Sequence, residues 1–240
     1  MLRKTKIICT LGPAVDDEET MRKLIRAGMD AARFNFSHGD HEEHLGRLNK
    51  LKTVRDSMSR PVATIMDTKG PEIRIKSFGV KSISLEAGDT FTLTTEDIVG
   101  NGERVSVTYP QLHEEVKPGM EILIDDGLVA LRVEEIQGQE IRCTVENGGT
   151  LSANKSINIP GVHIHLPALT EKDISDIQFA VENDFDFIAA SFIRRADDVR
   201  SIREVLHRFG GDNIQIISKI ENMQGVQNID EIIRVSDGIM

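Results

Sequence analysis

Over the first 70 positions the chain alternates between two patterns of apolar residues. Short β-branched runs at positions 6–10, 32–36 and 62–66 are typical of buried strands. Between them, apolar residues recur every three or four positions, as in an amphipathic helix. These helical faces carry Met21, Leu24, Ile25 and Met29, and then Leu45, Leu48, Leu51 and Val54. The alternation predicts βα units and a parallel sheet, with Asp17 as the first N-cap and Gly28 near that helix's end.

The pattern changes between about residues 71 and 167, where apolar and polar residues alternate at a period of two. The apolar pairs include Ile83 with Leu85, Phe91 with Leu93, Val105 with Val107, and Leu131 with Val133. Turn-forming pairs such as Asn101-Gly102 and Pro118-Gly119 separate these runs, without a helix-length apolar period. This pattern predicts a small all-β domain inserted into the βα framework.

The βα pattern returns at Thr170, an expected N-cap with Asp173 three positions later. Three further strands are predicted at residues 187–192, 215–220 and 238–240. The helices between these strands are predicted from the apolar residues Val199, Ile202, Val205 and Leu206, and then Val226, Ile229, Ile232 and Ile233. Six such strands exceed a small flavodoxin-like sheet and are two fewer than a closed eight-stranded barrel.

The predicted fold class is α/β, an incomplete (β/α)₈ barrel of the TIM type with an inserted small all-β barrel domain. The barrel domain is expected at residues 1–70 and 168–240, where it ends within the sixth strand, and the inserted domain at residues 71–167. From the pattern alone, a doubly wound sheet stays open as an alternative.

The charge balance restricts the possible partners. The chain has 240 residues with 29 Lys and Arg against 39 Asp and Glu, a net charge of −10. This sign disfavours non-specific wrapping of nucleic acid, so an anionic ligand must meet a local basic site. No apolar run is long enough for a transmembrane helix or a signal peptide, and the two cysteines indicate neither a disulfide framework nor a zinc site. A cytoplasmic protein without nucleic-acid or membrane partners is expected.

Polar residues of several chemical kinds accompany the ends of the predicted strands, where the active site of a βα barrel lies. They are Arg33, Asn35, Ser37 and His38 at the second strand, Asp67, Thr68 and Arg74 after the third, and Lys219 and Glu221 at the fifth. Fixed cations together with hard oxygen ligands for Mg²⁺ are what phosphoryl transfer requires. The common glycine-rich nucleotide loops are absent from the sequence and cannot explain phosphate binding.

Structural roles stay open for several of these groups. Arg33 and Arg74 are equally expected as partners in surface ion pairs. Asp67 and Thr68 are possible caps, although the Lys-Gly-Pro that follows them does not begin an ordinary helix. His38 is expected to be structural or to lie at the edge of a ligand, rather than to act as a general base.

Lys219 provides the strongest single signal. A lysine flanked by Ile217 and Ile220 in an apolar strand needs an anionic partner or a functional reason. Glu221, two positions later in an extended strand, faces the same side and is either that partner or a metal ligand. A purely structural pair of the two remains an alternative.

Several ordered motifs resemble the pyruvate kinase family. They are residues 7–13 (IICTLGP), 35–39 (NFSHG), 67–74 (DTKGPEIR), 124–128 (IDDGL), 190–194 (ASFIR) and 218–222 (SKIEN). The resemblance covers essentially the whole chain. It implies a barrel domain interrupted after its third strand by a mobile lid domain.

The resemblance also implies a role for each matching residue. Lys219 would stabilise the transferring phosphoryl group, and both Arg33 and Lys219 would bind the substrate. Glu221 would bind Mg²⁺ or Mn²⁺. The K⁺ ligands would be Asn35, Ser37, Asp67 and Thr68, the last through its backbone carbonyl. The nucleotide would be bound by Asn35, Phe36, Ser37, His38, Arg74 and Lys155.

The implied reaction transfers the phosphoryl group of phosphoenolpyruvate to ADP, giving pyruvate and ATP in glycolysis. Electrostatic stabilisation by lysine, arginine and metal ions would supply most of the acceleration, and lid closure would exclude water. The full-length enzyme is expected to be a homotetramer. Ser156 departs from the family, which usually has glycine there. The C-terminal half of the family pattern, including a second metal carboxylate, is missing, so this chain alone is expected to be inactive.

Two other functions stay open at this point. One is a non-catalytic protein that retains nucleotide binding, for which Mg·ATP binding without turnover is the expected sign. The other is an unrelated barrel lyase or aldolase that acts on phosphoenolpyruvate and uses Lys219 as a Schiff-base lysine. Trapping with borohydride in the presence of substrate distinguishes the second.

Overall fold

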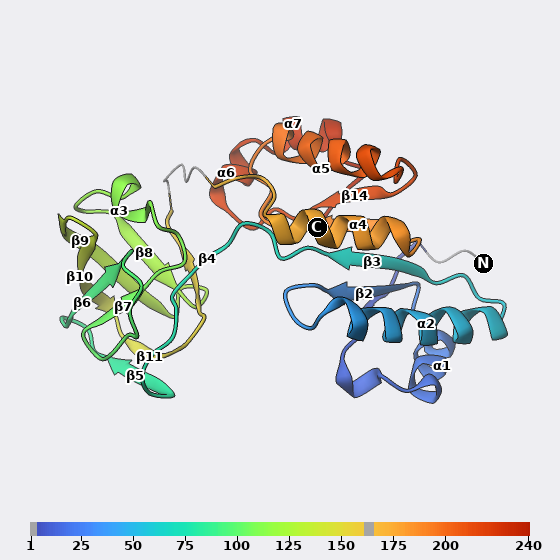
Figure 1. Ribbon diagram of the computed structural model, residues 1–240, viewed down its shortest axis with the longest axis horizontal. Helices are drawn as coiled ribbons and strands as arrows, with labels where there is room; N and C mark the ends of the chain where they lie inside the picture. Colours follow the sequence, from blue (N-terminus) through green and yellow to red (C-terminus); the bar gives the residue numbers. More distant parts are fainter. Residues whose placement is uncertain (1–3, 161–165) are drawn as a thin grey trace. The chain divides into compact units, whose positions relative to one another are not determined.

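A computed structural model describes residues 4–160 and 166–240 of the chain. These residues form two compact units, which Figure 1 shows in ribbon form. The first unit comprises Met1–Pro71, Pro167–Glu221 and Gly225–Met240, and the second comprises Glu72–Leu166 with Asn222–Gln224. Positions 161–165 of the predicted inserted segment lie outside the described residues. No helix in the described part is long and apolar enough to cross a membrane.

The first unit is built on a six-stranded parallel sheet. Its strands are β1 (Ile8–Thr10), β2 (Ala31–Asn35), β3 (Ala63–Asp67), β13 (Phe187–Ala190), β14 (Gln215–Ser218) and β15 (Gly238–Ile239). Each strand pairs with the next of these along the chain, in the order β1-β2-β3-β13-β14-β15. A doubly wound sheet reverses its strand order at a switch point, and this sheet has none. The doubly wound alternative is therefore wrong, and the sheet has the strand sequence of a partial barrel.

Helices connect these strands and run alongside them (Figure 1). They are α1 (Glu18–Ala27), α2 (His41–Ser57), α4 (Glu171–Glu182), α5 (Ala196–Phe209), α6 (Met223–Gln227) and α7 (Ile229–Val235), with a 3-10 turn at Pro13–Val15. The expected caps are confirmed at three points. Asp17 accepts a hydrogen bond from the Thr20 amide, Gly28 ends α1 at φ 114°, and Thr170 forms a capping box with Asp173.

One predicted helix differs from the structure. The apolar residues from Val226 to Ile233 were expected on a single helix, but α6 and α7 are separate and meet at Asn228. The Asn228 side chain donates to the Arg194 carbonyl, while the Asn228 backbone carbonyl accepts from the Glu231 and Ile232 amides of α7. Because these bonds hold Asn228 between two helix axes, the apolar spacing is interrupted, and Val226 and Ile233 are exposed.

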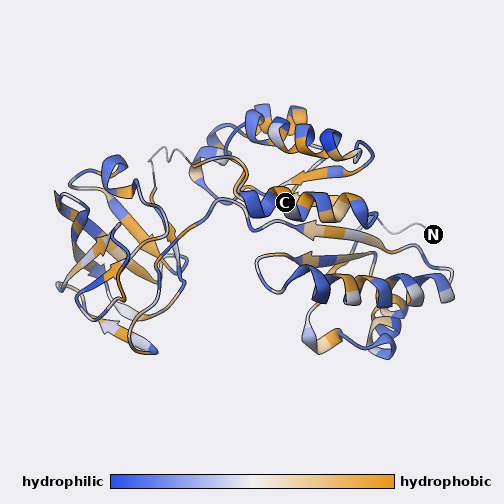
Figure 2. Cartoon of the chain, viewed as in Figure 1, coloured by the Kyte–Doolittle hydropathy of each residue, from blue (hydrophilic) through white to orange (hydrophobic). Residues whose placement is uncertain are grey.

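The helices pack on one face of the parallel sheet. The core there contains Phe34 and Phe36 from the β2 region, Phe185 before β13, and Leu48 and Leu51 from α2. The opposite face carries a separate small cluster of Ala31, Ile65 and Ala189. Figure 2 shows hydrophobic residues gathered along the strands and alternating with hydrophilic ones on the helices. The alternation of side chains along each strand therefore separates a packed face from a second face with room for polar groups.

The second unit is almost entirely β structure, with one helical turn at Leu112–Glu115 (α3). Seven strands form a sheet in the order β4-β12-β8-β9-β10-β6-β7, and β11 pairs with β5. Their bounds are Ile73–Arg74 (β4), Ser82–Leu85 (β5), Thr90–Thr94 (β6), Arg104–Ser106 (β7), Glu121–Ile124 (β8), Val129–Gln137 (β9), Glu140–Asn147 (β10), Gly149–Ser152 (β11) and Ser156–Asn158 (β12). The predicted period-two pairs are all buried in one cluster, which confirms the strand pattern.

The capping box of α4 provides a test of local stability. We expect Thr170→Ala to lower the free energy of unfolding by about 1 kcal/mol, because the hydroxyl group satisfies the otherwise unpaired Asp173 amide. Urea unfolding monitored by circular dichroism measures this change. The matched control is Thr53→Ala within α2, whose exposed hydroxyl bonds a carbonyl one turn earlier and is expected to matter little. Equal effects at both sites would contradict the assignment.

Candidate active site at the carboxyl ends of the strands

The polar residues predicted from strand ends gather at one edge of the parallel sheet. Asp67 is the last residue of β3 and is the register partner of Asn35, the last residue of β2. Arg33 lies two positions before Asn35, so both side chains leave the same face of β2. Lys219 follows directly after β14. This face is opposite the helix-packed core, on the side of the small Ala31, Ile65 and Ala189 cluster.

Asp67 is the centre of the cluster, with a side chain that is 1% exposed. Its Oδ2 accepts a hydrogen bond from Arg33 Nε at 2.5 Å, and Arg33 Nη2 contacts the same oxygen. Its Oδ1 accepts from Lys219 Nζ at 3.1 Å. A buried carboxylate requires such partners, because an unpaired charge in the interior is strongly unfavourable. One carboxylate therefore holds two cations from distant segments.

Lys219 has the anionic partner that its apolar strand required, and in fact has two. Its Nζ lies 3.1 Å from Asp67 Oδ1 and 3.0 Å from Glu221 Oε1. The strand ends at Ser218, two residues earlier than predicted, and the chain beyond it enters this polar cluster. Glu221 accepts a further bond through Oε2 from the Phe192 amide at 3.0 Å. Of the two roles left open for Glu221, partner of Lys219 or metal ligand, the structure shows the first, and the second stays a prediction.

Arg33 is more than a surface ion-pair partner. It is held between buried Asp67 and the hydroxyl group of Thr10, to which Nη1 donates at 2.8 Å. The capping alternative for Asp67 and Thr68 also fails, because Asp67 binds two cations and Thr68 is tied to β13. The Thr68 amide donates to the Ala189 carbonyl at 3.0 Å, and its own carbonyl accepts from Ser191 Oγ at 2.6 Å.

The loop after β2 is fixed by bonds within itself and to α2. Asn35 Oδ1 accepts from the Ser37 amide at 3.1 Å, which orients the side-chain amide. His44 of α2 bonds the His38 carbonyl through Nε2 at 2.9 Å and stacks on Phe36. The Phe36 side chain is buried in the core, so only its backbone can face a ligand. His38 itself is exposed at the end of the loop.

Arg74 and Lys155 belong to the second unit and lie on neighbouring segments there. Arg74 is in β4 and pairs in register with Ser156 of β12, directly after Lys155. Arg74 contacts Glu72 and donates to the Asn154 carbonyl, and Lys155 Nζ lies 2.9 Å from Asp125. Arg74 and Lys155 are therefore on neighbouring segments of the second unit, each bound to different partners, while the residues around Asp67 belong to the first unit.

Two site residues were missed by the sequence analysis. Ser191 Oγ lies 3.1 Å from Asp67 Oδ1 and 2.9 Å from Lys219 Nζ, and it joins both to the Thr68 carbonyl. Thr10 at the end of β1 anchors Arg33. Both residues stand where a strand ends, inside motifs that had been recognised. The general rule that polar residues follow strands would have identified them had it been applied to every strand.

The donor atoms at this edge fit hard cations. Amide and carboxylate oxygens come from Asn35 and Asp67, the last residues of the adjacent strands β2 and β3, and hydroxyl and carbonyl oxygens from Ser37 and Thr68 just beyond them. Among the described residues no group of three or more His, Cys, Asp or Glu side chains forms a metal site. Mg²⁺ commonly takes only one or two protein carboxylates and completes its shell with phosphates and water, so Glu221 alone is compatible with that mode.

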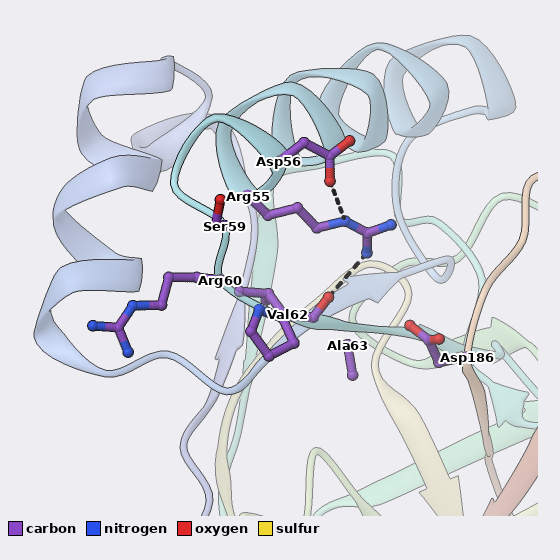
Figure 3. A pocket seen from close by; sticks show the side chains of 8 residues that line it. Arg55, Asp56, Ser59, Arg60, Val62, Ala63 and Asp186 are labelled. Atoms are coloured by element: carbon purple, nitrogen blue, oxygen red, sulfur yellow. Dashed lines mark hydrogen bonds and ion pairs between the residues drawn. The ribbon is translucent and has the colours of Figure 1, made fainter.

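A surface hollow of about 570 Å³ lies at the other end of the strands, away from these residues. It is lined around the end of α2, the first residue of β3 and Asp186 before β13 (Figure 3). In Figure 3, Arg55 bridges Asp56 and the Val62 carbonyl. None of the predicted site residues lines it, so the hollow and the polar cluster are distinct features of the first unit.

Comparison with known proteins gives a consistent result over the whole chain. Residues 2–240 match the family profile described as "Pyruvate kinase, barrel domain". The chain is 52% identical over 240 residues to a pyruvate kinase of Clostridium acetobutylicum and 48% identical to one of Clostridium perfringens, covering 100% of this chain and 51% of each relative. It is 48% identical over 242 residues to a pyruvate kinase of Geobacillus stearothermophilus, covering 41% of that protein. The chain spans about half the length of the curated relatives it matches.

The shared carboxylate generates a stability prediction. We expect Asp67→Asn to lower the free energy of unfolding by about 3 kcal/mol, because it breaks a buried ion pair. This value is at the lower end of the usual range, since Arg33 and Lys219 are partly exposed. Urea unfolding measures it. The control is Asp197→Asn, which removes an exposed ion pair with Arg200 and is expected to change stability by less than about 1 kcal/mol. A loss at Asp67 no larger than at Asp197 would refute the central role of this carboxylate.

His44 generates a pH prediction. Burial lowers the pKa of His44 below its usual value, and the positive charges of Arg47 and Lys172 also lower it. The bond to the His38 carbonyl and the negative charge of Asp176 raise the pKa but do not reverse the shift. The unfolded chain takes up this proton below a pH of about 6.5, whereas the folded chain does so only at lower pH. The contribution of neutral His44 to the free energy of unfolding is therefore complete above that pH. It is lost as the pH drops toward the pKa of His44 in the folded chain.

The measurement for His44 is a set of urea unfolding curves between pH 7.5 and pH 5. His44→Phe is expected to unfold more easily at neutral pH, because the bond to the His38 carbonyl is lost, but to lose less stability than the unmodified chain on acidification. Thr53→Ala, which removes an exposed hydroxyl group of α2 and no titrating group, is the control and is expected to keep the original slope. An unchanged slope in His44→Phe would show that this imidazole does not contribute.

Proposed function

The chain belongs to the pyruvate kinase family, and from this membership we propose that it supplies part of a site that transfers the phosphoryl group of phosphoenolpyruvate to ADP. The products of this reaction are enolpyruvate, which is then protonated to pyruvate, and ATP. Because the chain spans about half the length of its relatives, the proposal applies to a protein of their full length. The observation that carries it is the pair of cations, Arg33 and Lys219, held on one buried carboxylate.

Phosphoryl transfer depends on positioned positive charge rather than on a side-chain nucleophile. The transferred group spreads negative charge over its oxygens, and cations that are already fixed stabilise it without further reorganisation. Asp67 fixes both cations before any substrate arrives. In addition, Lys219 donates a hydrogen bond to Ser191, and Arg33 donates one to Thr10. In this proposal Lys219 stabilises the transferring group and Arg33 binds the phosphate of phosphoenolpyruvate.

Two kinds of metal ion complete the proposed site. Glu221 would hold Mg²⁺ or Mn²⁺, which supplies charge neutralisation on the phosphates when bound. The oxygens of Asn35, Ser37, Asp67 and Thr68 would hold K⁺. The Thr68 carbonyl already accepts one bond, from Ser191, and a carbonyl oxygen has a second lone pair for a cation.

The nucleotide is proposed to contact the loop from Asn35 to His38 together with Arg74 and Lys155. The pairing of Arg74 in β4 with Ser156 supports a joint role for the last two, since Lys155 directly precedes Ser156 in the same unit. In this proposal the second unit acts as a lid that excludes water from the reaction. Ser156, where the family usually has glycine, stands directly after Lys155 in β12 and is the point at which this contact would differ.

The 240-residue chain alone is proposed to be inactive, because the carboxylate and substrate residues expected from the other half of the family pattern are missing from it. A non-catalytic nucleotide-binding role for the chain itself is the second candidate, favoured by the position of Arg74 and Lys155 on neighbouring segments of one unit. Titration of the chain with Mg·ATP, followed by calorimetry, separates the two possibilities. Binding without turnover supports the second candidate, and absence of binding refutes it.

The kinase proposal is tested by Lys219→Met in a protein of the relatives' full length. We expect kcat to fall by about 10²- to 10³-fold, as for removal of a positioned electrostatic donor. Circular dichroism is expected to show that the fold is preserved. A coupled assay of ADP-dependent pyruvate formation measures kcat. The control Lys23→Met, which removes an exposed lysine paired with Glu19 in α1, should keep full activity. Unchanged turnover in Lys219→Met would exclude the role proposed for this lysine.

A further inference from the structure

The first turn of α4 contacts both loops that carry the proposed cation ligands. Lys172 Nζ donates to the Phe36 carbonyl at 3.0 Å, in the loop after β2. Asp173, the next residue, accepts through Oδ1 from the Gly70 amide at 3.0 Å, in the segment after β3. Two consecutive side chains thus bind the backbone of two loops that are more than 30 residues apart in sequence. The sequence predicted no role for Lys172, and for Asp173 only its place in the capping box of α4.

Lys172 is itself held firmly, although nearly half of its side chain is exposed. Its ammonium group lies 2.6 Å from Asp176 Oδ2, one turn later in α4. Asp176 is buried and is also bonded by His41 at 2.7 Å, and the Lys172 Nζ lies 5.9 Å from the centre of the Phe36 ring. The carboxylate therefore aims the ammonium group at the Phe36 carbonyl, because the buried acceptor must keep its partners.

Asp173 is fully buried and satisfied on both oxygens. Oδ2 accepts from the amide and hydroxyl groups of Thr170 in the capping box, which leaves Oδ1 directed at Gly70. Gly70 has φ 68°, and a side chain there would collide with Ser191, so its backbone fits closely in this place. The segment from Asp67 to Gly70 is thereby fixed at both ends, by the cation cluster and by α4.

The loop after β2 is also anchored at several backbone groups. The Phe36 amide donates to the Asp67 carbonyl, its carbonyl accepts from Lys172, and the His38 carbonyl accepts from His44. Ser37 lies between these anchored groups. Its amide in turn orients Asn35 Oδ1. A cation that exchanges its hydration shell for protein oxygens needs them all in place together, so the anchors determine how well the loop binds it.

We propose that Lys172 and Asp173 are positioning residues that hold the two loops in the geometry needed for the monovalent cation. This inference rests on the cation site in the proposed function. Neither residue touches the cation in the proposal, and each acts through the backbone of a loop that does. Outer contacts of this kind typically change metal affinity by about 10- to 100-fold when removed.

The main test measures binding of thallous ion, a K⁺ substitute observed by ²⁰⁵Tl NMR, to the unmodified chain and to Lys172→Met. We expect affinity to fall by about 10-fold or more in the variant, with competition by K⁺ in the unmodified chain. The matched control is Lys52→Met. Lys52 also donates to a backbone carbonyl, that of Asn183 at 2.9 Å, but at a position away from the two loops. Its variant is expected to bind the ion normally.

A second pair of variants tests Asp173 in the same assay. Asp173→Asn weakens both the cap and the bond to Gly70, whereas Thr170→Ala removes only the cap hydroxyl and leaves the bond to Gly70. Weaker ion binding in the first variant alone supports positioning, and equal binding in the two refutes it for Asp173. Hydrogen exchange at the Ser37 amide, expected to be faster in Lys172→Met and unchanged in Lys52→Met, gives a readout independent of the ion.

The possible failures can be told apart. If the unmodified chain binds no thallous ion, the proposed cation site is wrong and this inference fails with it. If the unmodified chain binds the ion and Lys172→Met binds it equally or more tightly, the inference fails for Lys172 while the site stands. Restoration of binding in Lys172→Arg, which keeps the charge and hydrogen-bond donors, would support the contact with the Phe36 carbonyl as the cause.

Discussion

The site depends on one buried carboxylate, that of Asp67, which satisfies its charge with Arg33 and Lys219 at the same time. Arg33 is in β2 and Lys219 directly follows β14, so the two cations are far apart in the sequence. Without this carboxylate, Arg33 would lose its anionic partner near the interior and Lys219 would keep only Glu221, which the low dielectric there makes unfavourable. The requirement to pair Asp67 therefore also fixes two cationic groups in place before any anionic ligand binds.

The parallel sheet makes this convergence possible. Because every strand of the first unit runs in the same direction and pairs with its predecessor, all carboxyl ends reach one edge. Side-chain alternation then places Arg33, Asn35 and Asp67 on the face away from the helices, where small residues such as Ala31 and Ala189 leave space. The opposite face is filled by large apolar side chains and the helices, so stability and chemistry occupy different faces of the same strands.

Helix α4 contributes both to the core and to the arrangement of the site. A helix that buries Ile177 and Phe179 in the core also uses its first turn to bind two loop backbones through Lys172 and Asp173. Asp173 of the capping box that begins the helix also binds the segment after β3, through its other carboxylate oxygen. Local helix chemistry and the arrangement of the site are thus linked by a single aspartate.

The sequence by itself determined the strands, most helices and their caps, because hydrophobic period and capping residues are local properties that persist in the folded chain. It also located Arg33, Asp67, Lys219 and Glu221, since their motifs follow strands. It did not reveal Ser191, Thr10 or the contacts of Lys172, and it joined α6 and α7 wrongly. Those features arise from register and from approaches between distant segments, which depend on how strands and helices pack in three dimensions and leave no periodic signal along the chain.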